Sequence, residues 1–499
     1  MRTDYSVIER IERIAAAYPE RTAFKSRAGE MSYRQLWERS QQIASALSDR
    51  LARDERPVMV YGHKSPWMAA AFLGCVRAGR AYCPVDVSMP ESRIRDIAAR
   101  IGNPLIIATE PLALAGYEIT TPQQLMQEGS GRCEERSLWR RDEDTFYIIF
   151  TSGSTGKPKG VEISARSLQN FLTWSRGLIA EALPGGESTG VFINQAPFSF
   201  DLSVFDLYSC LTSGGTLISL DKELQGDTAA MFAFLREGGA RIWVSTPSFA
   251  DMCLADPAFC GDNFAALKLF LFCGERLSKE TAAALMERFP QASVVNTYGP
   301  TESTVAVTAV TITEEMLRAE EALPVGRVRG GSEIFFDGEE MIIAGDTVAK
   351  GYFKDRQKTA AAFFETELKD GQKVRAYRTG DSGYCRDGYY YCTGRIDLQV
   401  KLHGYRIELG DIESNLLEIP HVQQACVVPR YDGERIRNLV SFVKAPEMDG
   451  TFRDGRFLRE LLKEKLPKYM IPKNIIFIDE MPMTVNGKLD RKKLEGMLA

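Results

Sequence analysis

The sequence predicts an α/β protein with a large N-terminal domain and a small α+β C-terminal domain. Strand-like and helix-like segments alternate from the N-terminus to about residue 300, a pattern typical of sheets with helices on their faces. Short strands punctuated by glycine follow between about residues 325 and 395, and they favour a small β-barrel or meander. With 499 residues, the chain is also longer than one ordinary domain.

The N-terminal region supplies the alternation of helices and strands. Apolar residues recur there with helical or strand-like spacing. The expected helices cover residues 8–17, 38–51, 67–77 and 168–178, and the expected strands cover residues 57–61 and 190–194. These segments predict a large N-terminal domain made of α/β subdomains.

The C-terminal region is compact and of mixed type. Residues 422–428 and 439–443 are expected to be strands, and residues 457–465 a helix. We place the domain boundary near Asp397. The N-terminal core then comprises residues 1–396, and the C-terminal domain comprises residues 397–499.

Composition excludes several classes of function. A formal net charge of −5 provides no basic surface for nucleic acid. The N-terminus lacks an apolar signal core, and no apolar run is long enough for stable membrane insertion. Ten cysteines without a CxxC pair favour reduced thiols and a cytoplasmic protein. The three histidines, His63, His403 and His421, offer little for a zinc site or a Ser-His-Asp triad.

A polar loop follows a buried strand at residues 146–150. Residues 151–160 combine glycines, hydroxyls and two lysines, Lys157 and Lys159. Glycine lets the backbone approach a ligand closely, and backbone N–H groups can form a nest for an anion. The spacing of its glycines differs from a Walker A motif. The loop therefore predicts a phosphate site of another kind.

Three later strands also run into small or polar residues, at 245–248, 273–275 and 296–302. Ligands of open α/β sheets bind at the carboxyl ends of strands, so these exits are expected to line one crevice. Asp201 stands near the start of a helix whose apolar face includes Phe200 and Val204. Its carboxylate either complements the helix dipole or meets a cationic group of a ligand.

Five motifs in sequence order resemble those of the acyl-adenylate-forming ligases over nearly the whole chain. This superfamily includes acyl-CoA synthetases, luciferases and the adenylation domains of peptide synthetases. The motifs are the phosphate loop at 151–160, the nucleotide motif at 296–302, the ribose motif at 377–381, the hinge at 394–397 and the lysine motif at 486–488. Residues 194–204, 245–249 and 272–275 are most similar to the branch that activates D-alanine.

The resemblance implies a reaction in two halves. ATP and an amino acid, D-alanine, would give an aminoacyl-adenylate and pyrophosphate. The phosphopantetheine thiol of a carrier protein would then displace AMP, as in the D-alanylation of teichoic acids. ATP and Mg²⁺ are the implied cofactors, and the small domain is expected to rotate about Asp397 between the two halves.

The resemblance also assigns roles to individual residues. Lys488 would be the catalytic lysine, Glu302 the Mg²⁺ ligand, and Asp201 the partner of the substrate ammonium. The substrate pocket would add Cys273 and Val305, and Lys488 would reach both substrate and phosphate. The nucleotide would contact Thr151, Ser152, Asn296, Thr297, Tyr298, Gly299, Pro300, Thr301, Asp381, Cys392, Thr393, Gly394, Arg395 and Lys488.

Other interpretations remain open at this stage. Tyr298 and Cys273 could be ordinary core residues, and Lys488 could be a solvated lysine in a basic tail. The chain could be a stand-alone adenylation enzyme for another small amino acid, or a nucleotide-binding protein without catalysis. A fatty-acyl ligase is disfavoured by Asp201. Residues 331–343 are shorter than the equivalent stretch of the family, which places a peripheral hairpin in doubt.

Overall fold

The computed structural model describes residues 5–52, 54–128, 135–153, 157–183, 185–186, 189–433, 435–483 and 489–498. The chain divides into two compact units. The first unit comprises residues 1–86, 101–149 and 160–396. The second comprises residues 87–100, 150–159 and 397–499. Lys488 lies outside the described residues.

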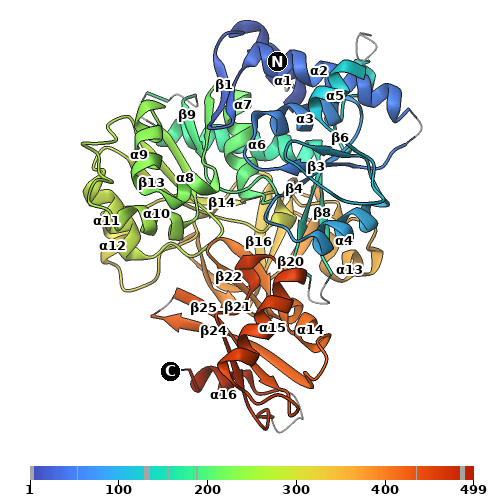
Figure 1. The fold of residues 1–499 in the computed structure, drawn as a ribbon. Coiled ribbons are helices and arrows are strands. Elements are labelled where there is room, and N and C mark those ends of the chain that lie inside the picture. The colour runs from blue at the N-terminus through green and yellow to red at the C-terminus, as the bar shows by residue number, and fades with distance from the viewer. Residues whose placement is uncertain are drawn as a thin grey trace. The chain divides into compact units, whose positions relative to one another are not determined.

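A nine-stranded sheet forms one layer of the first unit (Figure 1). Its central strands β13, β12, β11, β9, β10 and β1 are parallel, and antiparallel strands close both edges. In sheet order the strands are β15 (Arg327–Val328), β14 (Thr308–Thr311), β13 (Ser293–Tyr298), β12 (Leu269–Phe272), β11 (Ile242–Ser245), β9 (Val191–Asn194), β10 (Thr216–Ser219), β1 (Thr22–Ser26) and β2 (Gly29–Ser32).

A seven-stranded sheet has a parallel centre made of β7, β4, β3, β5 and β6. Its strands in order are β18 (Gly351–Tyr352), β8 (Lys159–Ser164), β7 (Thr145–Thr151), β4 (Tyr82–Asp86), β3 (Val58–Gly62), β5 (Ile106–Ala108) and β6 (Ile119–Thr120). The parallel arrangement of both sheets confirms the α/β prediction for this region.

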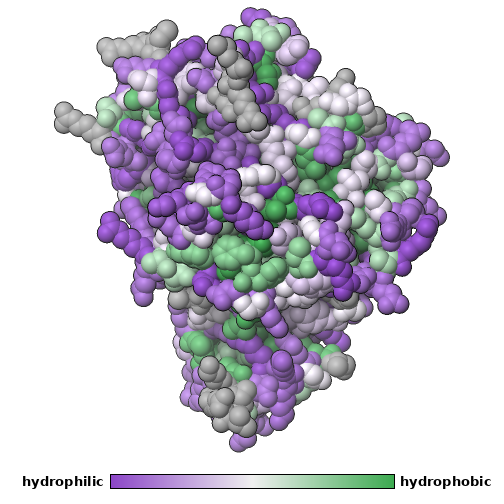
Figure 2. Space-filling model, turned by 180° about the vertical axis from the view of Figure 1, so that it is seen from behind, coloured by the Kyte–Doolittle hydropathy of each residue, from purple (hydrophilic) through white to green (hydrophobic). Residues whose placement is uncertain are grey.

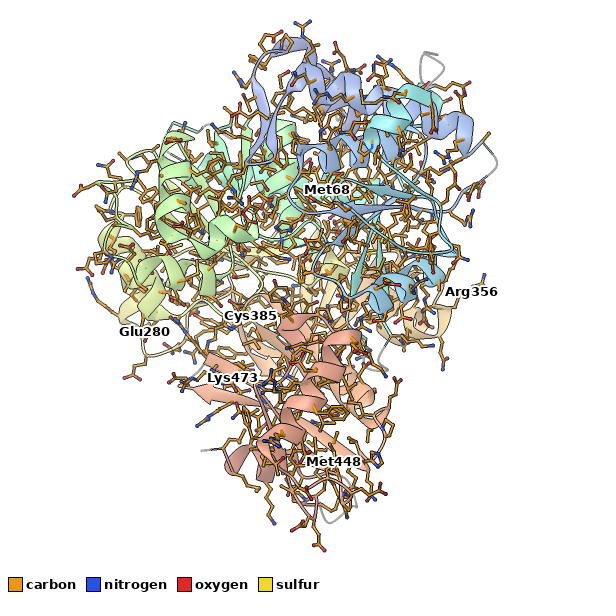
Figure 3. All side chains as sticks on the ribbon, in the orientation of Figure 1. Met68, Glu280, Arg356, Cys385, Met448 and Lys473 are labelled. Atoms are coloured by element: carbon orange, nitrogen blue, oxygen red, sulfur yellow. The ribbon has the colours of Figure 1, made fainter. Side chains whose placement is uncertain are left out.

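Helices connect and cover these strands, as expected for parallel sheets. Two begin with complete capping boxes, at Ser6 with Glu9 and at Ser32 with Gln35. The helices of the first unit are α1 (Val7–Ala17), α2 (Tyr33–Arg50), α3 (Pro66–Arg77), α5 (Pro122–Glu128), η1 (Arg136–Leu138), α6 (Ala165–Ala182), α7 (Leu202–Ser213), α8 (Lys222–Gly226), α9 (Thr228–Glu237), α10 (Pro247–Leu254), α11 (Lys279–Arg288), η2 (Thr301–Ser303), α12 (Glu314–Arg318) and α13 (Arg356–Ala362). In Figure 3, Met68 on α3 lies among the packed side chains of the interior, whereas Glu280 and Arg356 are exposed.

An antiparallel sheet stands where the sequence predicts a barrel or meander. Its long central strand β20 (Lys373–Arg386) pairs with three neighbours. The other strands are β16 (Ser332–Asp337), β17 (Glu340–Gly345), β19 (Phe363–Glu367) and β21 (Tyr389–Arg395). The antiparallel strands are thus confirmed, but their order differs from a simple meander, because β17 pairs with β20 and not with the next strand in sequence. Residues 332–345 form a regular hairpin.

One strand boundary differs from the sequence prediction. β13 continues through Tyr298, whereas we expected a loop from Asn296 onward. The extension is stabilised by β14, because Tyr298 pairs with Thr308 in the antiparallel ladder. Local apolar periodicity does not reveal this partner strand.

The second unit combines two small sheets with helices. β22 (Gln399–Leu402) pairs with β23 (Tyr405–Glu408), and the other sheet joins β24 (Gln424–Asp432), β25 (Arg435–Lys444) and β26 (Asn474–Phe477). Its helices are α4 (Glu91–Ile101), α14 (Leu409–Leu417), α15 (Phe452–Lys465), η3 (Lys468–Met470) and α16 (Arg491–Gly496). The α+β character predicted for the C-terminal region is confirmed.

The surface is mixed in polarity. Hydrophilic residues prevail on the face in Figure 2, with hydrophobic residues in smaller groups. Across the residues that the structure describes, no helix combines the length and the apolar character needed to cross a bilayer.

A buried lysine makes the stability of the first unit depend on pH. Lys64 is 1% exposed, and its Nζ donates to the side-chain oxygen of Asn194 at 2.5 Å. Burial lowers the pKa of Lys64 to about 7, whereas the pKa of a lysine in an unfolded chain is about 10.4. The unfolded chain therefore binds more protons between these two values, so this group makes the free energy of unfolding rise with pH.

Replacing Lys64 by methionine is expected to remove that rise. Urea unfolding at pH 7, 8 and 9 measures the free energy of unfolding of both proteins. The difference, wild type minus Lys64→Met, should increase with pH by up to about 1.4 kcal/mol per pH unit. Apart from Asp206, whose pKa the charge of Lys64 lowers, the other titrating groups are common to both proteins and largely cancel in the comparison. Parallel pH dependences for the two proteins would contradict the assignment.

Candidate active site

Asp381, on β20, is the centre of a buried hydrogen-bonded cluster. Its Oδ2 accepts a hydrogen bond from the hydroxyl of Tyr298 at 2.6 Å, and its Oδ1 accepts one from Nη1 of Arg395 at 2.7 Å. Burial, followed by the charge of Asp381, raises the pKa of Tyr298, so its phenol remains a neutral donor. A carboxylate offers about four acceptor positions, so the two hydrogen bonds leave room for two hydroxyls of a ligand.

Strands β20 and β21 fix this geometry. Asp381 and Arg395 are directly opposite in the antiparallel register. Arg395 also donates from Nη2 to the carbonyl of Thr379 at 3.1 Å. The guanidinium is therefore held in place on two sides, and it holds the carboxylate in turn.

The neighbouring residues of β21 are more exposed. Thr393 shares a hydrogen bond with Ser382 at 3.0 Å, and the thiol of Cys392 donates to the carbonyl of Gly394 at 3.8 Å. Cys392, Thr393 and Gly394, which are predicted to contact the nucleotide, lie on β21, the strand that ends at Arg395.

Asn296 and Thr297 use their side chains to hold the backbone. The Asn296 amide nitrogen donates to the carbonyl of Pro324 at 2.8 Å, and the Thr297 hydroxyl donates to the carbonyl of Phe272 at 2.8 Å. Both residues are buried on β13. Their side-chain donors therefore fix the strand that carries Tyr298.

Glu302 is fully buried in the short helix η2, which follows Gly299 and Pro300 and begins at Thr301. Its Oε1 accepts a hydrogen bond from the hydroxyl of Tyr352 at 2.9 Å. No sequence pattern points to Tyr352, because this contact joins residues fifty positions apart. A carboxylate is the hard oxygen donor that Mg²⁺ prefers, commonly alongside phosphate and water oxygens, so Glu302 fits that ion.

A strained turn follows Glu302. Thr304 and Val305 both have positive φ, 60° and 71°, which is unfavourable for residues other than glycine. The N–H of Ala306 donates to the carbonyl of Thr304 at 2.9 Å and closes the turn. Gly299 packs against it so closely that a Cβ there would lie 2.6 Å from Cα of Ala306.

The turn brings Val305 to Cys273. The Cys273 thiol donates to the carbonyl of Val305 at 3.6 Å, and both residues are buried. The two predicted pocket residues, which come from different strand exits, are therefore in contact.

Asp201 is the N-cap residue of α7. Its side chain makes no capping hydrogen bond to the helix, which separates it from an ordinary capping aspartate. Helix α7 packs against β9, β10 and β11 of one sheet and reaches the other through a 2.8 Å hydrogen bond between the hydroxyls of Tyr208 and Tyr82. The carboxylate is thus carried by a helix held on both sides.

Thr151 and Ser152 belong to the second unit. The Ser152 hydroxyl donates to the carbonyl of Arg406 at 2.9 Å and accepts from the N–H of Glu408 at 3.2 Å. The Thr151 hydroxyl is buried, with no hydrogen-bond partner among the described residues. An unpaired buried hydroxyl at a predicted phosphate loop suits a ligand oxygen.

Two family profiles match the chain. The profile described as AMP-binding enzyme matches residues 11–353, and the AMP-binding enzyme C-terminal domain matches residues 411–488.

Curated relatives match over almost the whole length. A D-alanine–D-alanyl carrier protein ligase from Bacillus licheniformis is 43% identical over 98% of this chain and 99% of its own. One from Listeria monocytogenes is 42% identical with the same coverage.

Solved structures share the fold. PA1221, a protein with adenylation and PCP domains, matches with a TM-score of 0.82 and 25% identity over 98% of this chain and 84% of its own. The Vibrio cholerae adenylation domain AlmE, solved with glycyl-adenosine-5'-phosphate, matches with a TM-score of 0.80 and 21% identity over 99% of this chain and 97% of its own.

Proposed function

The chain belongs to the AMP-binding enzyme family, and on this basis we propose that it activates D-alanine with ATP and transfers it to a carrier-protein thiol. The observation that carries the proposal is the 43% identity to a ligase of that name across 98% of the chain. The Asp381 cluster and the Cys273–Val305 contact supply side chains suited to a nucleotide and a small substrate.

In the first half-reaction, a carboxylate oxygen of D-alanine attacks the α-phosphorus of ATP. A new O–P bond forms, the α–β phosphoanhydride bond breaks, and pyrophosphate leaves with the electron pair. The nucleophile is already ionised, so no general base is required. Charge repulsion between carboxylate and polyphosphate opposes the step, so positioning and electrostatic stabilisation dominate catalysis.

The nucleotide is held mainly by the Asp381 cluster. Asp381 accepts hydrogen bonds from the ribose hydroxyls, while Arg395 keeps its carboxylate oriented. Tyr298 presents its ring to adenine. Thr151 and Thr301 donate to phosphate oxygens.

Three further residues balance the charges of the reacting groups. Glu302 would hold Mg²⁺, and the ion would supply positive charge that offsets the charge of the polyphosphate. Lys488 bridges the substrate carboxylate and the phosphate. Asp201 pairs with the substrate ammonium, while Cys273 and Val305 wall the space for a methyl side chain.

In the second half-reaction, the phosphopantetheine sulfur attacks the carbonyl carbon of the aminoacyl-adenylate. A C–S bond forms, and the bond from that carbon to the phosphate oxygen breaks. AMP leaves with the electron pair, and the thiol proton passes to solvent. The product is a thioester on the carrier protein.

An exchange assay with a panel of amino acids tests the proposal. The enzyme, ATP, Mg²⁺ and labelled pyrophosphate are combined with D-alanine, L-alanine, glycine or D-serine. D-Alanine is expected to give the highest kcat/KM, because the walled pocket admits a methyl group in one orientation. A higher value for another amino acid would instead favour a stand-alone adenylation enzyme with that substrate.

A further inference from the structure

The hydroxyl of Tyr147 is buried without a hydrogen-bond partner among the described residues. The residue lies on β7 and is 0% exposed. Buried hydroxyls in native proteins are nearly always paired, and leaving one unpaired is unfavourable. The group therefore requires an explanation.

Tyr147 belongs to an aromatic layer between β4, β7 and α7. Its ring lies 5.9 Å from that of Tyr82, and Phe146 packs edge-on against Tyr208 at 5.7 Å. The hydroxyls of Tyr82 and Tyr208 pair with each other at 2.8 Å. Of three tyrosines in one layer, only Tyr147 has an unpaired hydroxyl.

Asp201 is the N-cap residue of α7, the helix that carries Tyr208 of this aromatic layer. Burial raises the pKa of Tyr147, and the charge of Asp201 is the next contribution in the same direction. The phenol is therefore neutral and lies in the field of a negative charge. The hydroxyl of Ser199, two residues before Asp201, is also buried without a partner in the described part of the chain.

The charge and the unpaired hydroxyl favour a cationic ligand group. A substrate carboxylate placed beside Tyr147 would be repelled by Asp201, whereas an ammonium would be attracted. An ammonium has three N–H donors, and a single carboxylate oxygen satisfies one of them. A neutral phenol oxygen nearby is a suitable second acceptor.

We infer that Tyr147 is a second contact for the substrate's amino group, its oxygen accepting a hydrogen bond from the ammonium that Asp201 neutralises. This inference rests on the proposed function, because it requires an amino acid substrate. It gives the buried hydroxyl a hydrogen-bond partner. It also adds selectivity, because a carboxylic acid without an amino group would leave a buried polar group unpaired.

Two conservative variants test the inference. Tyr147→Phe removes only the unpaired oxygen, and Tyr82→Phe removes a paired oxygen from the same aromatic layer. For Tyr147→Phe we expect the KM for the amino acid to rise roughly 10- to 100-fold, as for a lost hydrogen bond to a charged group. The KM for ATP should be unchanged, and the melting temperature should be equal or higher.

Tyr82→Phe should show the opposite pattern. Its melting temperature should fall, because the Tyr208 hydroxyl loses its partner. Its KM for the amino acid should stay within about twofold, as for a hydrogen bond remote from the ligand.

The outcomes separate this inference from the proposed function. The KM is measured with whichever amino acid gives the highest kcat/KM in wild-type exchange. An unchanged KM in Tyr147→Phe, or a lower melting temperature with both KM values raised, overturns the role of Tyr147 alone. Absence of exchange with every amino acid in the wild-type enzyme overturns the proposed function and the inference together.

Discussion

Replacing Asp201 by asparagine is expected to raise the KM for D-alanine by about 100-fold, or about 2.7 kcal/mol, while the KM for ATP stays unchanged. The substitution keeps the size of the side chain and removes its charge. The substrate ammonium then loses its counterion, whereas the Asp381 cluster is untouched. Steady-state exchange with each substrate varied in turn measures both constants.

Asp206 provides a matched control on the same helix. Burial raises the pKa of this carboxyl well above its usual range, and asparagine keeps the size and shape of the side chain. Its Oδ1 accepts a hydrogen bond from Asn194 at 2.9 Å, and the asparagine oxygen can keep that contact. Asp206→Asn should leave both KM values within about twofold. Equal effects at Asp201 and Asp206 would show that the helix, and not the Asp201 charge, was disturbed.

Replacing Asp381 by asparagine is expected to weaken ATP binding and to spare D-alanine binding, the reverse of Asp201→Asn. The KM for ATP should rise roughly 10- to 100-fold, because hydrogen bonds to a charged acceptor are worth about 1.5–3 kcal/mol. The variant also leaves the guanidinium of Arg395 beside a neutral amide. The KM for D-alanine should change little. Exchange rates at varied ATP concentration give the comparison.

Asp337 provides the control for this variant. It pairs with Arg378 at 2.9 Å in the same antiparallel sheet, but both side chains are largely exposed. Exposed ion pairs contribute about 0–1 kcal/mol. Asp337→Asn should therefore leave the KM for ATP unchanged. A comparable loss in both variants would indicate a general weakening of the sheet.

Much of the architecture follows from local sequence patterns. The alternation of apolar segments before residue 300 predicts the parallel sheets, and glycine-punctuated strands predict the antiparallel one. The family resemblance assigns Tyr298, Asp381 and Arg395 to the nucleotide, and in the structure Tyr298 and Arg395 both hydrogen-bond to Asp381.

The remaining features depend on contacts between distant parts of the chain. The partner of Glu302, Tyr352, lies on another strand, and nothing near Glu302 in sequence indicates it. Val305 has a positive φ in a turn that lies close against Gly299, and apolar periodicity does not encode this turn. Tyr147 has the sequence context of an ordinary core residue. Only the structure shows that its hydroxyl has no hydrogen-bond partner among the described residues.

The central claim is that this site activates a zwitterion because Asp201 neutralises its ammonium. Propionate has the carboxylate and size of alanine but no amino group, so adenylate formation from D-alanine and from propionate tests the claim most directly. The account predicts that wild-type enzyme strongly prefers D-alanine and that Asp201→Asn loses most of this preference. Equal use of the two acids by the wild-type enzyme, or a preference that survives in Asp201→Asn, would contradict it.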